Sequence, residues 1–565
     1  MKTVLPNHPL VAHWLLDGGA NDAVAGNHGC VRNVEWVAGP GGRAGGAALF
    51  NGRDSVITVA DSPALQLGSA DFTLSAWIRC RTPMRGVYGD VLSKFDAANR
   101  CGLNLWISGG SSAYSAISDS RHLHVGIDDG YLGAWKDCGN PGSGSPMVCS
   151  MAVHGGELYA GIADATSDEQ ACRVFRRGRG GQWIDCGRLG ANPDARSVMS
   201  MLVHEGHLYA GAGVWDWWAA ELGRRETPPR CMTRVYRYEG GTAWRDLGQV
   251  GTGQRVLCLA SFEGALYAGL DRGGEGRCFK YQDERWVDCG VLDERDNFET
   301  LMPVGGTLYG ASHAAIYRYD GGRAWTCIGR KPFDLEQIHS LNVLDGKLVA
   351  GTWPQGWVIR HEGGTDWTNM GQVGLAVGKP GVARINEVNS LGVHNGKLYA
   401  GVLPKAQVCR YETDGHWTLL DNLASRRDWN PADLPSWMRV LALATHRGML
   451  FACTGACQAR AVDLDPDRTA GRVMCAQAGI VASHEHDLGG QWTRLAAVRR
   501  AKELRLYING TLAARSAAPA RRYFDLGNAE PLRIGRGEQG SFDGAISDVR
   551  LYAGALDERA MGVLD

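Results

Sequence analysis

Tryptophan residues are concentrated in a few short segments of this chain. Two of them are Val214-Trp-Asp-Trp-Trp218 and Thr352-Trp-Pro-Gln-Gly-Trp357. An indole presents a flat apolar face that the C–H bonds of a pyranose ring can cover. Indoles grouped on one surface therefore predict a carbohydrate site, with the candidates Trp215, Trp217, Trp218, Trp353, Trp357 and Trp437. The alternative is that these side chains pack between structural elements.

A second group of candidates is polar and recurs at one place in successive repeats of the sequence. Each residue begins, or lies two residues into, an apolar run that precedes a Leu-Tyr-Ala-Gly-like motif. The group comprises Arg255, Glu299, Gln337, Glu387 and Arg439 at the first position, and His339 and Asn389 two residues further on. Such side chains supply the directed hydrogen bonds that position hydroxyls or carboxylates. The alternative is that the charges are merely solvated.

Four of these residues also allow an enzymatic interpretation. Glu299 and Glu387 could be the acid and base of a glycoside hydrolase, which needs two carboxylates across a cleft. A polysaccharide lyase could instead use His339 with a tyrosine, while Arg255 neutralises a uronate. The Ser-x-Asp-x-Gly-x-x-Trp box of sialidase blades does not occur. Non-catalytic binding is the favoured hypothesis, and an enzyme at the same site is an alternative.

Seven repeats carry these residues. The Leu-Tyr-Ala-Gly element, degraded in some copies, begins at Leu158, Leu208, Leu266, Leu308, Leu348, Leu398 and Leu450. A tryptophan marks the last strand of each unit, at Trp135, Trp183, Trp244, Trp286, Trp325, Trp367 and Trp417. A period of roughly 40 to 60 residues with about four short strands is typical of a propeller blade. Because the repeats open with Trp135, that strand is expected to complete the seventh blade.

Strand direction sorts the loops of a propeller onto two faces. The starts of the inner strands and the loops between second and third strands share one face, so the polar group and the tryptophans are expected around one mouth of the central channel. The turn before Leu-Tyr-Ala-Gly belongs to the opposite face. Four histidines recur there, at His154, His204, His394 and His446, and a role in the turn is favoured over a metal or pH-sensing role.

The two flanks of the repeats have strand patterns of their own. Phe72–Ile78 and Leu103–Ile107 precede the repeats, and Leu504–Ile508 follows them and enters Asn509-Gly510, a strong two-residue hairpin signal. These flanks resemble the two halves of a laminin-G-like (concanavalin-A-like) jelly-roll domain. The matching segments are His13–Asp17, Asn21–Gly29, Phe50–Val59, Phe72–Trp77, Leu92–Lys94, Trp492–Val498, Leu506–Thr511 and Phe542–Tyr552.

This resemblance implies a nested, all-β protein: a seven-bladed β-propeller inserted into a jelly-roll β-sandwich. The expected parts are 1–130 for the first half of the sandwich, 131–468 for the propeller and 469–565 for the second half. The repeats themselves resemble kelch blades in Val393–Gly401, Val408–Tyr411 and Trp417, although the double glycine of kelch repeats is missing. Insertion suits a propeller because ring closure brings its two ends together.

The sandwich family also suggests a calcium site. Its members often hold Ca²⁺ between an early Asn-Asp segment and a late Asp-Val-Arg strand, and the matching oxygen donors here are Asp22, Asn27 and Asp548. The early loop departs from the family pattern, since Asn21-Asp-Ala-Val-Ala-Gly replaces Asp-Ser-Ser/Ala-Gly. The alternative is that these residues only form turns.

Composition limits the partners and the compartment. The chain has 565 residues, 78 glycines and a net charge of −1, which argues against nucleic acid or an anionic membrane as partner. Most of the 16 cysteines are expected to be reduced, because the recurrent Cys138, Cys186 and Cys289 fall in different blades. No apolar signal segment or membrane span is seen, which predicts a cytoplasmic protein; export by a non-standard route is the alternative.

The favoured function is therefore recognition of a carbohydrate or glycoconjugate at the tryptophan-rich propeller face, with the sandwich as a further binding surface. The alternatives are a protein-interaction scaffold and a carbohydrate-active enzyme. Fold alone does not separate the three, because both folds host many unrelated activities.

Overall fold

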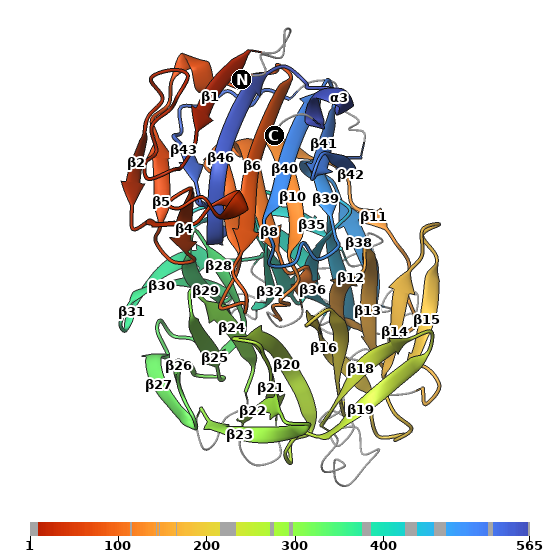
Figure 1. Ribbon diagram of the computed structural model, residues 1–565. Helices are drawn as coiled ribbons and strands as arrows, with labels where there is room; N and C mark the ends of the chain where they lie inside the picture. The colour runs from red at the N-terminus through yellow and green to blue at the C-terminus, as the bar shows by residue number, and fades with distance from the viewer. Residues whose placement is uncertain are drawn as a thin grey trace.

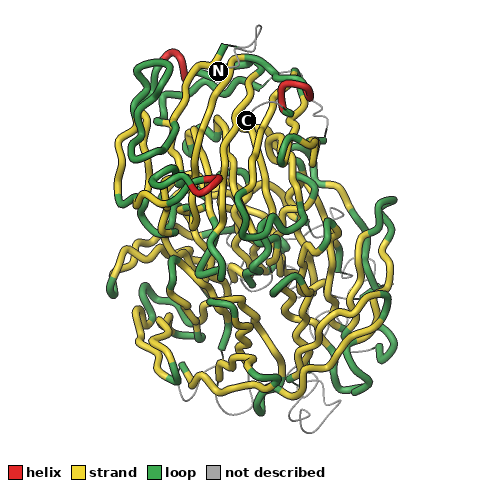
Figure 2. Tube along the Cα trace, viewed as in Figure 1, coloured by secondary structure: helices red, strands yellow, loops and turns green. Residues whose placement is uncertain are grey.

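The computed structural model describes residues 9–112, 116–142, 144–145, 147–164, 167–214, 233–271, 276–292, 298–375, 386–423, 438–456, 471–517 and 524–562. Strands dominate this part of the chain (Figure 2). Its helices are short: η1 (Pro40–Gly42), η2 (Pro63–Leu65) and α3 (Glu558–Met561). Figure 1 shows a sandwich above a ring of blades.

Both ends of the chain contribute strands to each sheet of the sandwich, so red and blue strands lie side by side in Figure 1. One sheet contains β1 (Leu10–Trp14), β3 (Glu35–Val37), β4 (Ala47–Asn51), β6 (Phe72–Cys80), β40 (Thr493–Arg500), β41 (Glu503–Ile508), β42 (Thr511–Arg515) and β46 (Asp543–Ala553). The other contains β2 (Gly29–Arg32), β5 (Val56–Val59), β7 (Gly89–Asp96), β8 (Cys101–Ser108), β10 (His122–Leu132), β39 (Ala478–His484), β43 (Leu532–Ile534), β44 (Arg536–Gly537) and β45 (Gly540–Ser541). The propeller is inserted between β10 and β39, which pair with each other.

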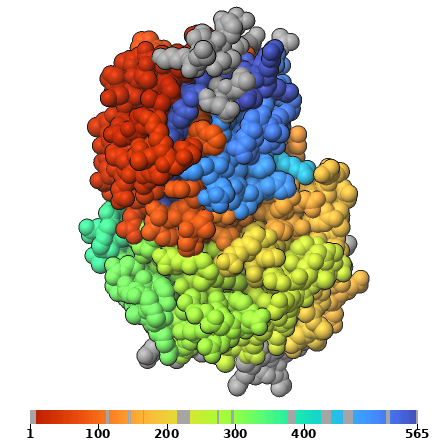
Figure 3. All heavy atoms as spheres, viewed as in Figure 1, coloured from red at the N-terminus to blue at the C-terminus, as the bar shows by residue number. Residues whose placement is uncertain are grey.

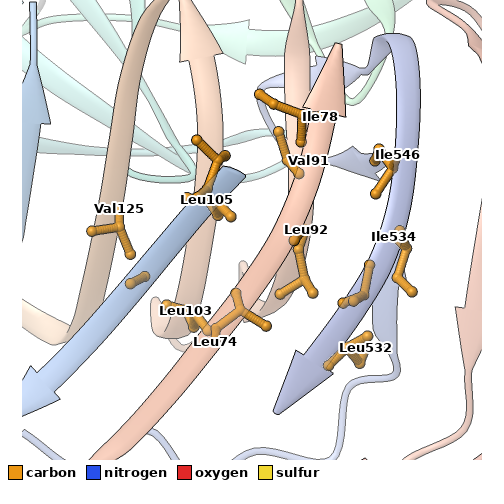
Figure 4. Packing of buried hydrophobic residues seen from close by; sticks show 14 of the residues in the cluster. Leu74, Ile78, Val91, Leu92, Leu103, Leu105, Val125, Leu532, Ile534 and Ile546 are labelled. Atoms are coloured by element: carbon orange, nitrogen blue, oxygen red, sulfur yellow. The ribbon is translucent and has the colours of Figure 1, made fainter. Parts of the chain in front are cut away.

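One apolar core joins the two halves of the sandwich (Figure 4). Alternate residues of β6, among them Leu74 and Ile78, point into it together with Ile534 and Ile546 from the other end of the chain. The expected strands at Phe72–Ile78 and Leu103–Ile107 are confirmed. The Asn509-Gly510 hairpin is also confirmed, since Ile508 pairs with Thr511 and both turn residues have positive φ.

The outer face of the second sheet is turned toward the propeller. In β8 and β10 one set of alternate residues enters the sandwich core, whereas Asn104, Trp106, His124 and Gly126 belong to the other set. Gly126 allows the closest approach, because a Cβ built there would lie 2.1 Å from Oδ1 of Asn395. These two strands therefore serve two interfaces at once.

The ring has seven blades in the described residues, each an antiparallel meander. Blades 1 to 3 are β12 (Met147–His154), β13 (Glu157–Ala163), β14 (Arg173–Arg177), β15 (Trp183–Arg188); β16 (Ser197–His204), β17 (His207–Gly213), β18 (Arg234–Gly240), β19 (Ala243–Gln249); and β20 (Arg255–Phe262), β21 (Ala265–Asp271), β22 (Arg277–Gln282), β23 (Arg285–Val291). Blades 4 to 6 are β24 (Thr300–Val304), β25 (Thr307–Ala311), β26 (Ala315–Gly321), β27 (Ala324–Arg330); β28 (Gln337–Leu344), β29 (Lys347–Trp353), β30 (Trp357–Gly363), β31 (Asp366–Gln372); and β32 (Glu387–His394), β33 (Lys397–Leu403), β34 (Gln407–Thr413), β35 (His416–Asn422).

The seventh blade takes strands from both ends of the insert. It consists of β36 (Met438–His446), β37 (Met449–Ala456), β38 (Val473–Ala476) and β11 (Lys136–Asp137), where Lys136 pairs with Cys475. The ring closes as β36 contacts β12, which also pairs with β9 (Ser111–Ser112). The second junction differs from the expected boundary at residue 468, because β38 still belongs to this blade and the chain returns to the sandwich only at β39.

Every blade docks on the sandwich through the turn between its first and second strands. One N–H group in each turn donates a hydrogen bond to an acceptor of the sandwich. The donors are the backbone N–H groups of Gly156, Glu205, Glu263, Gly306, Asp345 and Arg447 and, in the remaining turn, the side-chain amide of Asn395. The recurrent histidines lie at this face, as their position in the repeat predicts. Two of them do more than complete turns, because His204 lies 3.2 Å from Asp119 and His446 lies 2.7 Å from Glu485 of the sandwich.

The Glu485 contact yields a stability prediction. Its carboxylate accepts from Nδ1 of His446 and from the backbone N–H of Arg447, and both side chains of the Glu485–His446 pair are buried. Glu485→Leu leaves the buried imidazole of His446 and the backbone N–H of Arg447 without their acceptor, so we expect a loss of about 1–3 kcal/mol. Urea denaturation followed by tryptophan fluorescence measures it. The exposed Glu239→Leu on blade 2 is the control, and an equally small effect of both substitutions would contradict the docking role of Glu485.

Candidate functional site

The candidate site lies at the channel mouth away from the sandwich. Arg255, Gln337 and Glu387 begin the inner strands β20, β28 and β32, Arg439 is the second residue of β36, and Glu299 directly precedes β24. The sandwich covers the turns at the opposite ends of these strands. Figure 3 shows the sandwich stacked on one side of the propeller. The mouth formed by the strand starts is therefore the end of the channel that the sandwich leaves uncovered.

His339 lies between two glutamates at this mouth. Its Nδ1 is 3.8 Å from Oε2 of Glu299, and its Nε2 is 3.8 Å from Oε1 of Glu387. The ring is oriented by Gln337, whose Oε1 lies 2.8 Å from Nε2. The structure thus brings together side chains from blades 4, 5 and 6 that are far apart in sequence.

Cations and amides complete the cluster around each glutamate. Nε2 of His313 lies 2.6 Å from Oε1 of Glu299. Oε1 of Glu387 accepts a short hydrogen bond from Asn389 and lies 3.5 Å from Nε of Arg439. Arg255 forms a short ion pair with the buried Asp271 and acts electrostatically on Glu299. All seven expected polar residues, Arg255 included, therefore belong to one charged network.

Both glutamates are held in the ionised form. Burial opposes the charge of Glu299, but His313, His339 and Arg255 outweigh it and lower its pKa from 4.5 to about 2. Burial likewise opposes the charge of Glu387, yet His339, Arg439 and the Asn389 hydrogen bond lower its pKa. Neither carboxyl is thus protonated at neutral pH in this arrangement, as the general acid of a glycoside hydrolase would have to be.

The third position of the inner strands, counted from the strand-start residues, differs between blades. It holds His339 and Asn389 in blades 5 and 6. In blades 1, 2, 3 and 7 it holds buried side chains that pack into one apolar core cluster, namely Cys149, Met199, Leu257 and Leu441. The polar pair retains unused hydrogen-bonding capacity, because Nδ1 of His339 and Oδ1 of Asn389 are buried without a hydrogen-bond partner among the described residues.

The tryptophan candidates separate into three cases. Trp353 ends β29, pairs with Gln337 across the strands and is partly exposed at the mouth. Trp357 begins β30 and packs against the apolar core between blades 4 and 5, as the packing alternative predicts. Trp215, Trp217, Trp218 and Trp437 lie outside the described residues. Within the described residues, Trp353 is the indole that borders the charged network.

Two members of the network were not among the sequence candidates. His313 lies in the short loop between β25 and β26, and Asp271 ends β21 directly opposite Arg255. The loops between second and third strands were expected on this face, so the position of His313 was an available signal. In the equivalent loops of other blades, the tryptophans were predicted as ligand-binding residues instead. Asp271 carried no motif and is recognised only from its contact with Arg255.

The residues expected to bind calcium do not fit a cation. The Asp22 carboxylate accepts hydrogen bonds from the backbone N–H groups of His13, Val24, Ala25 and Asn27 and from the Asn27 amide. The Asp548 carboxylate contacts His13 and both ends of the Arg550 guanidinium. These oxygens are occupied by N–H donors, as in the turn-forming alternative. Among the described residues, no group of three or more His, Cys, Asp or Glu side chains is arranged to hold a metal.

One protein-family model matches part of this chain. Residues 434–560 match the Laminin_G_3 family model, described as the concanavalin A-like lectin/glucanases superfamily. The match extends over β36 to β38 of the propeller as well as over the C-terminal sandwich strands. A search of curated proteins found no match to the sequence.

Solved structures of low sequence identity resemble part of this chain. One is virginiamycin B lyase from Staphylococcus aureus, at 9% identity and a TM-score of 0.40, covering 61% of this chain and 99% of that chain. Another is the WD40 β-propeller domain of Doa1, at 10% identity and a TM-score of 0.40, covering 61% of this chain and 97% of that chain. These likenesses carry no argument about activity. In the described part of the chain, no helix has the length and apolarity to cross a membrane.

The lowered pKa of Glu299 yields a pH prediction. A carboxyl whose folded pKa lies below its unfolded value stabilises the fold above about pH 4.5, and this contribution is lost as the pH falls toward about 2. We therefore expect the stability difference between wild type and Glu299→Gln to be largest above pH 4.5 and to shrink on acidification. Urea denaturation at a series of pH values measures it. A difference that stays constant with pH would contradict the assignment.

The turn role of Asp22 yields a second prediction. Asp22→Ala removes the acceptor of several backbone N–H groups, so we expect a loss of about 1–3 kcal/mol in unfolding free energy. Because the carboxylate serves N–H donors, the loss is expected to be equal in calcium and in EDTA. Thermal denaturation in both buffers checks it, and a stabilisation by calcium that only the wild type shows would contradict it.

Proposed function

We propose that this protein binds a carbohydrate, without converting it, at the open mouth of its propeller. The observation that carries the proposal is a polar cluster around His339 and Asn389, with unpartnered polar atoms among the described residues, beside the partly exposed Trp353. A pyranose has hydroxyls at its rim and C–H groups on its faces. Its hydroxyls can bond the polar cluster while one ring face covers the indole.

The unused polar atoms support this choice over a purely structural network. A buried polar atom without a partner costs about 1–3 kcal/mol, and buried ionised groups are costly even when they are paired. Ligand hydroxyls can donate to Oδ1 of Asn389 and exchange a hydrogen bond with Nδ1 of His339. Trp353 at the rim adds an apolar surface for a ring face. The match to a lectin and glucanase superfamily in the sandwich agrees with a sugar-related protein.

The alternatives receive less support. The glycoside hydrolase reading needs a protonated carboxyl, whereas Glu299 and Glu387 both have lowered pKa values. A lyase using His339 and Arg255 has no tyrosine in the described network, and Arg255 is engaged by Asp271. The kelch-like character of the blades and a role as protein scaffold stay predictions. The sandwich already covers one face of the ring.

Glycan binding of wild type and variants tests the proposal. On a glycan array followed by calorimetry of the best ligand, we expect Asn389→Ala and Trp353→Ala each to weaken binding roughly tenfold, about 1.4 kcal/mol. Val287→Ala, at an exposed position of the outer strand β23, is the matched control and should bind as wild type does.

Two outcomes would contradict the proposal. One is unchanged affinity in both variants, and the other is a wild type that binds no glycan. Release of sugar products from a polysaccharide panel, lost in Glu299→Gln or Glu387→Gln, would favour the enzyme alternative instead.

A further inference from the structure

A cavity lies between the sandwich and the base of the propeller. It measures about 110 Å³ and is lined by residues of both domains. Trp106, Ile107 and Val87 border it from the sandwich, while Leu391, Val393 and Leu443 border it from blades 6 and 7. The cavity is separate from the proposed sugar site, since its propeller residues lie toward the ends of the inner strands rather than at their starts.

Most of the polar side chains that line this cavity bond within the protein. Ser108 bonds His124, Thr445 bonds His394, and the Ser118 hydroxyl accepts from the N–H of Val203. Asn342 uses its amide nitrogen on the Leu391 carbonyl and its oxygen on the Val343 N–H. Nε2 of Gln539 is buried without a hydrogen-bond partner among the described residues.

The lining surface is more apolar than polar. Apolar cavities of about 150 Å³ take up benzene or xenon. Trp106 adds a flat surface, held in place by stacking on His124 at a centroid distance of 4.9 Å. The lining therefore favours a small apolar or aromatic molecule.

We propose that this cavity is a second ligand site, specific for small apolar or aromatic molecules that contact both domains. Its occupant bridges the sandwich and blades 6 and 7, so binding stabilises the docked arrangement of the two domains. The proposal is independent of sugar binding at the opposite end of the channel.

Xenon is the direct probe of the wild-type protein. In crystals held under xenon pressure, we expect one xenon atom in this cavity, against Trp106 and Leu443. Ordered water in the cavity, or no xenon density there, would overturn the proposal. This experiment needs no variant.

Indole is the probe in solution, read as the thermal midpoint of the intact chain against indole concentration. Val87 is partly exposed and lines the cavity, so Val87→Phe can fill the space without loss of a core residue. We expect the midpoint to rise with indole for wild type and for the control Val31→Phe on β2, and not to rise for Val87→Phe. An equal response of Val87→Phe and wild type would overturn the proposal.

Discussion

The docking of seven blade turns on the sandwich is the constraint on which the rest of the molecule depends. Each turn donates a hydrogen bond to the sandwich, so the propeller is held by contacts that repeat around its ring. Strands β8 and β10 contribute to this interface because their alternate residues serve the sandwich core and the docking face. The sandwich thereby covers one end of the channel and leaves the strand starts at the other end.

The same constraint explains where the repeats diverge. At the covered face the turns keep a common form, with positive φ at Glu205, Glu263, Asp345, Asn395 and Arg447. At the open face the residues at and near the starts of the inner strands differ from blade to blade. Blades 4 to 6 supply Glu299, His339 and Glu387, whereas blades 1 and 2 supply the buried Met147 and Ser197. The site is thus a local departure from a symmetrical ring.

The charged network is stable because every member is held by another. His339 is oriented by Gln337, Glu387 by Asn389 and Arg439, and Arg255 by Asp271. In a buried place such mutual pairing offsets part of the cost of desolvation, and it fixes the side chains in one arrangement. Preorganisation of this kind suits recognition of a ligand with several hydroxyls, because few side chains have to be ordered when the ligand binds.

The sequence by itself determined the periodic features of this protein. The repeat of Leu-Tyr-Ala-Gly and tryptophan, the alternation in Phe72–Ile78 and the Asn509-Gly510 turn follow local rules, and they were sufficient to predict the blades and the sandwich strands. The strand starts also identified Glu299, His339, Glu387 and Asn389, because position within a blade determines position at the channel mouth.

Only the tertiary structure decided which of these residues touch one another. Contacts such as His313 with Glu299 and Arg255 with Asp271 each lie within one blade, yet no sequence motif marks His313 or Asp271. Asp22 and Asp548 are a further example. Their carboxylate oxygens are of the type that binds calcium, but in the folded protein they bond N–H groups and Arg550. Residue type limits the chemistry that a side chain can perform, and its neighbours in space select one role from that range.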